Sequence, residues 1–120
     1  MILGVGTDLV EIDRVRKACE RDSFVVRTFT ELERRQAGDK ISRFAGSFAV
    51  KEAVAKALGT GFAEGIGPRD VAVRSLPSGK PELVLSGKAR EKADALGVKK
   101  LHLTLTHTRD NAAAVVILEG

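Results

Sequence analysis

The sequence is poor in aromatic residues and in cysteine. It has no Trp and no Tyr, and its five Phe residues are its only aromatic side chains. Proteins that bind RNA or single-stranded nucleic acid usually stack bases on several aromatic rings, so this scarcity disfavours that class. The single cysteine, Cys19, permits no disulfide within the chain and suits a reducing compartment. We expect Cys19 to be a small buried apolar side chain.

Long hydrophobic runs and a strong excess of one charge are also missing. Met1 leads directly into a short apolar segment without a preceding basic stretch, which argues against a signal peptide or a membrane span. A net charge of +4 suits an anionic ligand or an acidic partner, but it falls short of a dedicated nucleic-acid binder. We therefore expect a cytoplasmic protein whose partners include no membrane and no nucleic acid.

The chain of 120 residues has the length of one domain, residues 1–120, and no repeat or linker divides it. Apolar and alternating patterns predict strands over residues 2–10, 71–76, 82–85, 101–105 and 112–118, the first of them stopping near Asp8. Helical spacing, caps and glycine stops predict helices over residues 11–22, 30–36, 42–58 and 86–96. Because the later strands form hairpins, we predict an α+β fold with a largely antiparallel sheet packed on a long central helix.

The central helix carries two charged residues on one face. Glu52 and Lys56 are four residues apart and lie opposite the apolar stripe of that helix. A solvated ion pair between them is the commoner explanation of such spacing. However, Phe44 and Phe48 lie on the same side as Glu52, and charges beside aromatic rings are typical of a cleft wall.

Asp8 stands out because it follows a strongly apolar segment. It could cap the next helix through backbone N–H groups. If Asp8 and Glu52 converge instead, two carboxylates would form a hard oxygen site suited to Mg²⁺, which also takes water and phosphate oxygens as ligands. Lys56 would then add a positive charge for a phosphate oxygen, an arrangement typical of phosphoryl transfer.

Three further features bear on which ligand the protein could bind. His107, flanked by threonines and followed by Arg109, could bind phosphate or an adenine edge, or could simply end a strand. The glycines at residues 4–6 lack the third glycine of a dinucleotide fingerprint. Two His and one Cys are too few ligands for a zinc site.

A basic row lies on the first predicted helix. Arg14, Lys17 and Arg21 share one face, and Phe24 extends the row. Such a row is often only a solvated surface. An exposed Phe among cations is also typical of a docking site for an acidic amphipathic helix.

Taken together, these residues resemble the holo-acyl-carrier-protein synthase family, the small single-domain 4′-phosphopantetheinyl transferases. The resemblance occurs in the family's order and runs nearly end to end, and the turn Gly79-Lys80-Pro81 is also similar. The matching segments are Gly4-Val5-Gly6-Thr7-Asp8-Leu9-Val10-Glu11-Ile12, Phe44-Ala45-Gly46-Ser47-Phe48-Ala49-Val50-Lys51-Glu52-Ala53 with Lys56-Ala57-Leu58-Gly59-Thr60-Gly61, and Leu105-Thr106-His107-Thr108.

The resemblance implies a complete set of site residues. Asp8 and Glu52 would bind Mg²⁺ and Lys56 would contact the phosphates of coenzyme A, which makes these three the expected catalytic residues. Family members commonly have Arg where this chain has Ser47, so Arg43, one turn earlier, is our substitute for holding the 3′-phosphate. The other residues expected to bind coenzyme A are Gly79, Lys80, Pro81, His107 and Thr108.

The resemblance also implies partners and a reaction. Arg14, Lys17, Arg21 and Phe24 would face the acidic helix of an acyl carrier protein, and the active sites would lie at the subunit interfaces of a homotrimer. The expected reaction transfers 4′-phosphopantetheine from coenzyme A to a carrier serine and releases 3′,5′-ADP, a step in fatty acid biosynthesis. The alternatives are a small basic RNA- or ribosome-binding module without catalysis and, more weakly, a magnesium-dependent nucleotide hydrolase, since no Walker-type loop is present.

Overall fold

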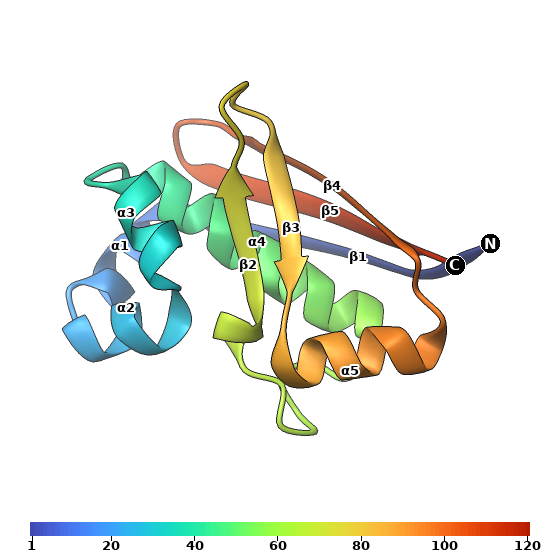
Figure 1. Ribbon diagram of the computed structural model, residues 1–120. Helices are drawn as coiled ribbons and strands as arrows, with labels where there is room; N and C mark the ends of the chain where they lie inside the picture. Colours follow the sequence, from blue (N-terminus) through green and yellow to red (C-terminus); the bar gives the residue numbers. More distant parts are fainter.

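Three long strands form the main sheet (Figure 1). They are β1 (Ile2–Glu11), β4 (Lys100–His107) and β5 (Asn111–Glu119). Their pairs are antiparallel in the order β1-β5-β4, so the first strand of the chain lies beside the last. The computed structural model describes residues 1–120, and its two termini meet at one end of this sheet (Figure 1).

The central helix, α4 (Ile41–Leu58), packs across one face of this sheet. Its predicted apolar stripe is buried in the main core. β1 approaches it very closely, because a Cβ added at Gly4 would lie 2.3 Å from the Ala57 carbonyl oxygen and one at Gly6 would lie 1.8 Å from that of Ala53. The glycines of this motif therefore provide close strand–helix packing.

The remaining strands form a second, two-stranded antiparallel sheet rather than part of the first. This ribbon and helix α5 cover the side of α4 away from the main sheet (Figure 1). A short 3₁₀ turn, η1 (Pro68–Asp70), leads into it. The ribbon and the following helix are β2 (Val71–Ser75), β3 (Pro81–Leu85) and α5 (Gly87–Leu96). The prediction of an antiparallel α+β fold is confirmed, with its strands divided between two sheets.

Three short helices precede α4, namely α1 (Ile12–Cys19), α2 (Asp22–Thr28) and α3 (Glu31–Ala37). The prediction of one helix over residues 11–22 is therefore wrong at its end, and α2 was missed. Arg21 has extended backbone angles, φ −96° and ψ 116°, which separate α1 from α2. The predicted capping box of α3 is confirmed, with both Thr30–Glu33 bonds present.

Two local predictions near the N-terminus are also wrong. β1 does not stop near Asp8, which pairs with Ala114 in mid-strand and caps no helix. Cys19 is half-buried rather than fully buried, although burial still raises the pKa of its thiol. No helix of the structure is both long and apolar enough to cross a membrane.

Candidate functional site

The packing of β1 on α4 brings Asp8 to the helix. Side chains two residues apart point to the same face of a strand, so Asp8 faces α4 as Gly4 and Gly6 do. Two residues of strand span about 6.6 Å and four residues of helix about 6 Å, so contacts advance in step along the two elements. Gly4 meets Ala57 and Gly6 meets the residue one turn earlier, and Asp8 therefore reaches the turn that carries Glu52.

Asp8 and Glu52 line one pocket of about 260 Å³, which we call the Asp8 pocket. Phe48 and Phe24 form part of its apolar wall, and Arg14 stands at its edge. The predicted convergence of the two carboxylates is thus present within a single chain. Phe48 also lies in the predicted cleft wall, whereas Phe44 packs edge-on against the ring of Phe29.

Lys56 binds Asp8 rather than Glu52. Its Nζ donates to Asp8 Oδ1 at 3.0 Å and to the Thr7 carbonyl oxygen at 3.0 Å. The Asp8 side chain is 16% exposed and that of Lys56 is 55% exposed, so the ammonium group stays open to solvent. The alternative of an ion pair between Glu52 and Lys56 is therefore wrong.

Glu52 is the unsatisfied group of the pocket. Its carboxylate makes no hydrogen bond or ion pair with another protein group. Burial, together with the negative charge of Asp8, raises the pKa of Glu52, and Lys56 only partly offsets this. A bound cation would offset the charge of Asp8 and stabilise the ionised form of Glu52 despite its burial.

The donor set of the Asp8 pocket fits a magnesium ion. Mg²⁺ prefers oxygen ligands and commonly takes only one or two protein carboxylates, with water and phosphate oxygens completing its shell. No group of three or more His, Cys, Asp or Glu side chains is placed to hold a metal. Asp8 and Glu52 are therefore the carboxylates that the protein would supply to a cation here.

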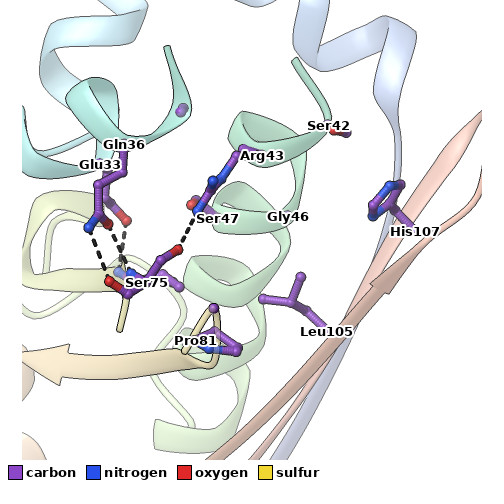
Figure 2. Close-up of a pocket in the computed structure, with 13 residues that line it drawn as sticks. Glu33, Gln36, Ser42, Arg43, Gly46, Ser47, Ser75, Pro81, Leu105 and His107 are labelled. Atoms are coloured by element: carbon purple, nitrogen blue, oxygen red, sulfur yellow. Dashed lines mark hydrogen bonds between the residues drawn. The ribbon is translucent and has the colours of Figure 1, made fainter. Parts of the chain in front are cut away.

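A second pocket, of about 220 Å³, lies between α4, β2 and β4 and is shown in Figure 2. We call it the Arg43 pocket. It brings together four of the residues predicted to bind coenzyme A, namely Arg43, Gly79, Pro81 and His107. Three serine residues also line it, at positions 42, 47 and 75. Cationic and hydroxyl groups of this kind suit a phosphorylated ligand.

Three residues predicted to contact coenzyme A do not join the Arg43 pocket, and one of them is Lys56, which binds Asp8. Lys80 lines a separate groove beside β3 and β4. Thr108 is exposed and accepts the Asn111 N–H in the final hairpin turn. Sequence reasoning in turn missed Gln36 and Ser75, because they meet across 39 positions of the chain and carry no local signal.

The Asp8 and Arg43 pockets face opposite sides of α4. Glu52 follows Arg43 by nine residues, which at about 100° per residue places the two side chains about 180° apart around the helix. The pockets also lie at opposite edges of the main sheet, since Asp8 is on β1 and His107 is on β4. One chain therefore does not unite them in a single cavity.

The predicted basic row is only partly free. Arg14 lines the Asp8 pocket, and the guanidinium of Arg21 lies 5.9 Å from the centre of the Phe24 ring. Lys17 instead forms an ion pair with Asp13 at 3.2 Å, which lowers the pKa of that carboxyl group. Phe24 is half-buried rather than exposed, because its ring packs against other aromatic rings, Phe48 among them.

Comparison with known proteins shows the family to which the chain belongs. A model of the 4′-phosphopantetheinyl transferase superfamily matches residues 4–116. The chain is 53% identical over 124 residues, covering all of both chains, to a holo-acyl-carrier-protein synthase of Nitratidesulfovibrio vulgaris strain DP4. The crystal structure of the Helicobacter pylori synthase in complex with coenzyme A matches with a TM-score of 0.86, at 32% identity over 96% of this chain and 99% of that one. The Neisseria meningitidis synthase matches with a TM-score of 0.88, at 33% identity over 100% of each chain.

Proposed function

The chain belongs to the 4′-phosphopantetheinyl transferase superfamily as a holo-acyl-carrier-protein synthase, and we propose how its residues perform that reaction. The enzyme transfers the 4′-phosphopantetheine arm of coenzyme A to a serine of an apo acyl carrier protein and releases 3′,5′-ADP. The observation that carries our proposal is the meeting of Asp8 and Glu52 in one pocket, with Lys56 beside them. We place the reaction in the cytoplasm, as a step of fatty acid biosynthesis, and the single thiol of Cys19 suits that reducing compartment.

In the proposed site, Asp8 and Glu52 hold a magnesium ion. Bound there, Mg²⁺ would offset the charge that develops on the diphosphate of coenzyme A during transfer. Lys56 holds a phosphate oxygen with the ammonium proton that Asp8 and the Thr7 carbonyl leave free. The proton of the carrier serine would pass to Glu52 directly, whose carboxylate faces the pocket without a protein partner, or to a water at the magnesium site.

We assign the nucleotide end of coenzyme A to the Arg43 pocket. Arg43 would bind the 3′-phosphate in place of the Arg that is missing at Ser47, and His107 would bind a phosphate or adenine edge. Gly79 and Pro81 present backbone and a small ring, which allow a flat base to approach closely. The Helicobacter pylori synthase, which shares this fold, was crystallised in complex with coenzyme A, and this supports coenzyme A as the ligand of the site.

We propose a homotrimer in which each active site combines the Asp8 pocket of one copy with the Arg43 pocket of a neighbour. One chain keeps the two pockets apart, whereas coenzyme A must reach both. The sheet face opposite α4 also exposes large apolar side chains, with Val5 at 58%, Leu9 at 70% and Val115 at 38% exposed. Val115 pairs with Thr7, which lies between Val5 and Leu9 on the same face of β1. The three apolar side chains therefore form one continuous patch suited to a partner subunit.

The carrier protein would dock beside the Asp8 pocket. Arg14, Arg21 and the partly exposed ring of Phe24 adjoin the pocket mouth and suit an acidic helix. Lys17 contributes less, because Asp13 neutralises it.

One assay tests the proposal. The protein is incubated with coenzyme A, Mg²⁺ and an apo carrier protein, and the carrier is weighed by mass spectrometry. We expect the added arm to appear, to disappear when EDTA is added, and to be absent from a carrier whose acceptor serine is replaced by Ala. Full transfer in EDTA would refute the magnesium site. Product release without a carrier would favour the hydrolase, and magnesium-independent, salt-sensitive RNA binding would favour the RNA-binding module.

A further inference from the structure

The outer edge of β2 is covered by side chains rather than by another strand. β2 pairs with β3 on one side only, which would leave the backbone groups of its other edge unsatisfied. Glu33 Oε2 accepts the Val73 N–H at 2.9 Å. Gln36 pairs with both backbone groups of Ser75, since its Nε2 donates to the carbonyl at 3.1 Å and its Oε1 accepts the N–H at 2.9 Å. Two residues of α3 thus act as a substitute strand.

The spacing of the residues explains this pairing. Val73 and Ser75 are two apart in β2, so their backbone groups point to the same edge. Glu33 and Gln36 are three apart in α3, so their side chains lie on the same face of the helix. Figure 2 shows both side chains reaching from α3 toward β2.

The two α3 residues differ in their other contacts. Glu33 is fixed in the core by Lys51, whose Nζ lies 2.7 Å from Glu33 Oε1. The Lys51 side chain is only 1% exposed. Both α3 residues line the Arg43 pocket, but both hydrogen bonds of Gln36 go to Ser75 and none goes to the core. Glu33 therefore belongs to the folding core, whereas Gln36 acts on the pocket wall.

Ser75 passes this constraint to Arg43. The Arg43 guanidinium donates from Nη2 to the Ser75 hydroxyl (Figure 2). Arg43 is otherwise an exposed side chain on α4, and a free arginine loses considerable rotamer entropy when it binds a ligand. A guanidinium has five N–H donors, so the bond to Ser75 leaves others for a phosphate.

We propose that Gln36 and Ser75 form a positioning relay that holds Arg43 toward the pocket and thereby sets the preference for a 3′-phosphorylated nucleotide. This inference rests on the proposed function, in which Arg43 contacts the 3′-phosphate of coenzyme A. Neither relay residue needs to touch the reacting atoms. Preorganising Arg43 lowers the cost of binding the phosphate, and a ligand without that phosphate gains nothing from it.

The test compares coenzyme A with 3′-dephospho-coenzyme A as donors for the carrier protein. We expect Gln36→Met to raise the KM for coenzyme A by about tenfold, because an unrestrained Arg43 would lose its rotamer entropy on binding the phosphate, with kcat within about twofold of wild type. The KM for the dephospho compound should change by less than about twofold. Arg35→Met is the matched control, because Arg35 is an exposed neighbour on α3 that lines neither pocket, and it should preserve the preference.

Two further variants separate the relay from a general loss of structure. Ser75→Ala keeps the backbone bonds to Gln36 and frees only Arg43, so it cannot act by unfolding the ribbon, and it should also weaken the preference. In an Arg43→Ala background, Gln36→Met and Ser75→Ala should each cause less than about a twofold further change in KM for coenzyme A.

The outcomes are distinct. Loss of preference in the single variants together with no further loss in the Arg43→Ala background supports the relay. The relay is overturned if KM rises equally for both donors, or if the effects of the relay variants on KM add fully to that of Arg43→Ala. In either case, transfer by the wild-type protein leaves the proposed function standing. A wild-type protein that transfers no arm from coenzyme A overturns the proposed function, and the relay with it.

Discussion

The Asp8 pocket and the Arg43 pocket lie on opposite sides of α4 and are built in opposite ways. The first depends on close steric packing, with β1 pressed onto α4 at Gly4 and Gly6, and it leaves the carboxylate of Glu52 without a protein partner. The second depends on hydrogen bonds from side chains to backbone, in which Gln36 and Ser75 satisfy one another. The pocket proposed for chemistry thus holds a carboxylate without any protein partner, whereas the charged group of the pocket proposed for binding, Arg43, is held by the Ser75 hydroxyl.

This difference follows from what each pocket is proposed to do. Charges that must act on a reacting group gain strength when they are held in place without a protein partner, although this lowers the stability of the empty fold. A binding pocket gains affinity when its groups are already held in their bound positions. The comparison therefore predicts different responses to substitution on the two sides of α4.

The largest expected effect follows from Glu52→Gln. We expect turnover to fall at least about a hundredfold, because the substitution removes a proposed ligand and a proposed base. Without metal, the same variant should have a higher melting temperature than wild type at about pH 8. The folded protein holds the Glu52 proton more tightly than the unfolded chain does, so wild-type stability falls as pH rises from the ordinary glutamate pKa through the raised one.

Melting curves at about pH 4 and about pH 8 check this prediction, since both forms of residue 52 are uncharged at the lower pH and the gain should then shrink. Glu91→Gln, an exposed substitution on α5, is the control. It should leave turnover unchanged, and the difference between its melting temperature and that of wild type should be the same at both pH values. A Glu52→Gln protein that is less stable than wild type at both pH values would contradict the unsatisfied charge.

A smaller effect, on stability, is expected from Gly6→Ala. The new Cβ would lie 1.8 Å from the Ala53 carbonyl oxygen, and neither backbone can move without separating β1 from α4. We expect a loss of about 3 kcal/mol in the free energy of unfolding, at the upper end of overpacking costs. Gly67→Ala is the matched control, because a Cβ there meets nothing within 4 Å. Urea unfolding measures the free energy of unfolding of both variants. If the two variants lose equal amounts, the close approach of β1 to α4 is not the cause of the loss.

The smallest effect is expected when two impaired subunits are mixed. If each site joins the Asp8 pocket of one copy to the Arg43 pocket of another, co-refolded Glu52→Gln and Arg43→Ala chains should form intact sites at about a quarter of the interfaces, the product of one half and one half. Activity at low coenzyme A concentration measures this recovery. Mixing Glu52→Gln with Asp8→Asn should restore nothing, because both damage the same pocket. Equal recovery in both mixtures would argue against shared sites.

Much of the fold could be predicted because its signals are local. The apolar stripe of α4, its glycine stop at Gly59 and the capping box at Thr30 each depend on residues within one or two helical turns. The end of β1 and the helix α2 were mispredicted because local signals did not specify them. β1 extends past Asp8 because β5 pairs with it along its whole length, and α2 has only seven residues, too few for a clear period.

The sequence by itself determined most of the elements, the unusual carboxylates of Asp8 and Glu52 and, through family resemblance, the reaction. Only the tertiary structure decided which groups are neighbours. It paired Lys56 with Asp8 across 48 positions instead of with Glu52 one turn away, and it joined Gln36 to Ser75 across 39. Periodicity states which face of an element a residue occupies, but the partner of that face is chosen by the packing of whole elements, here by two glycines that let β1 meet α4.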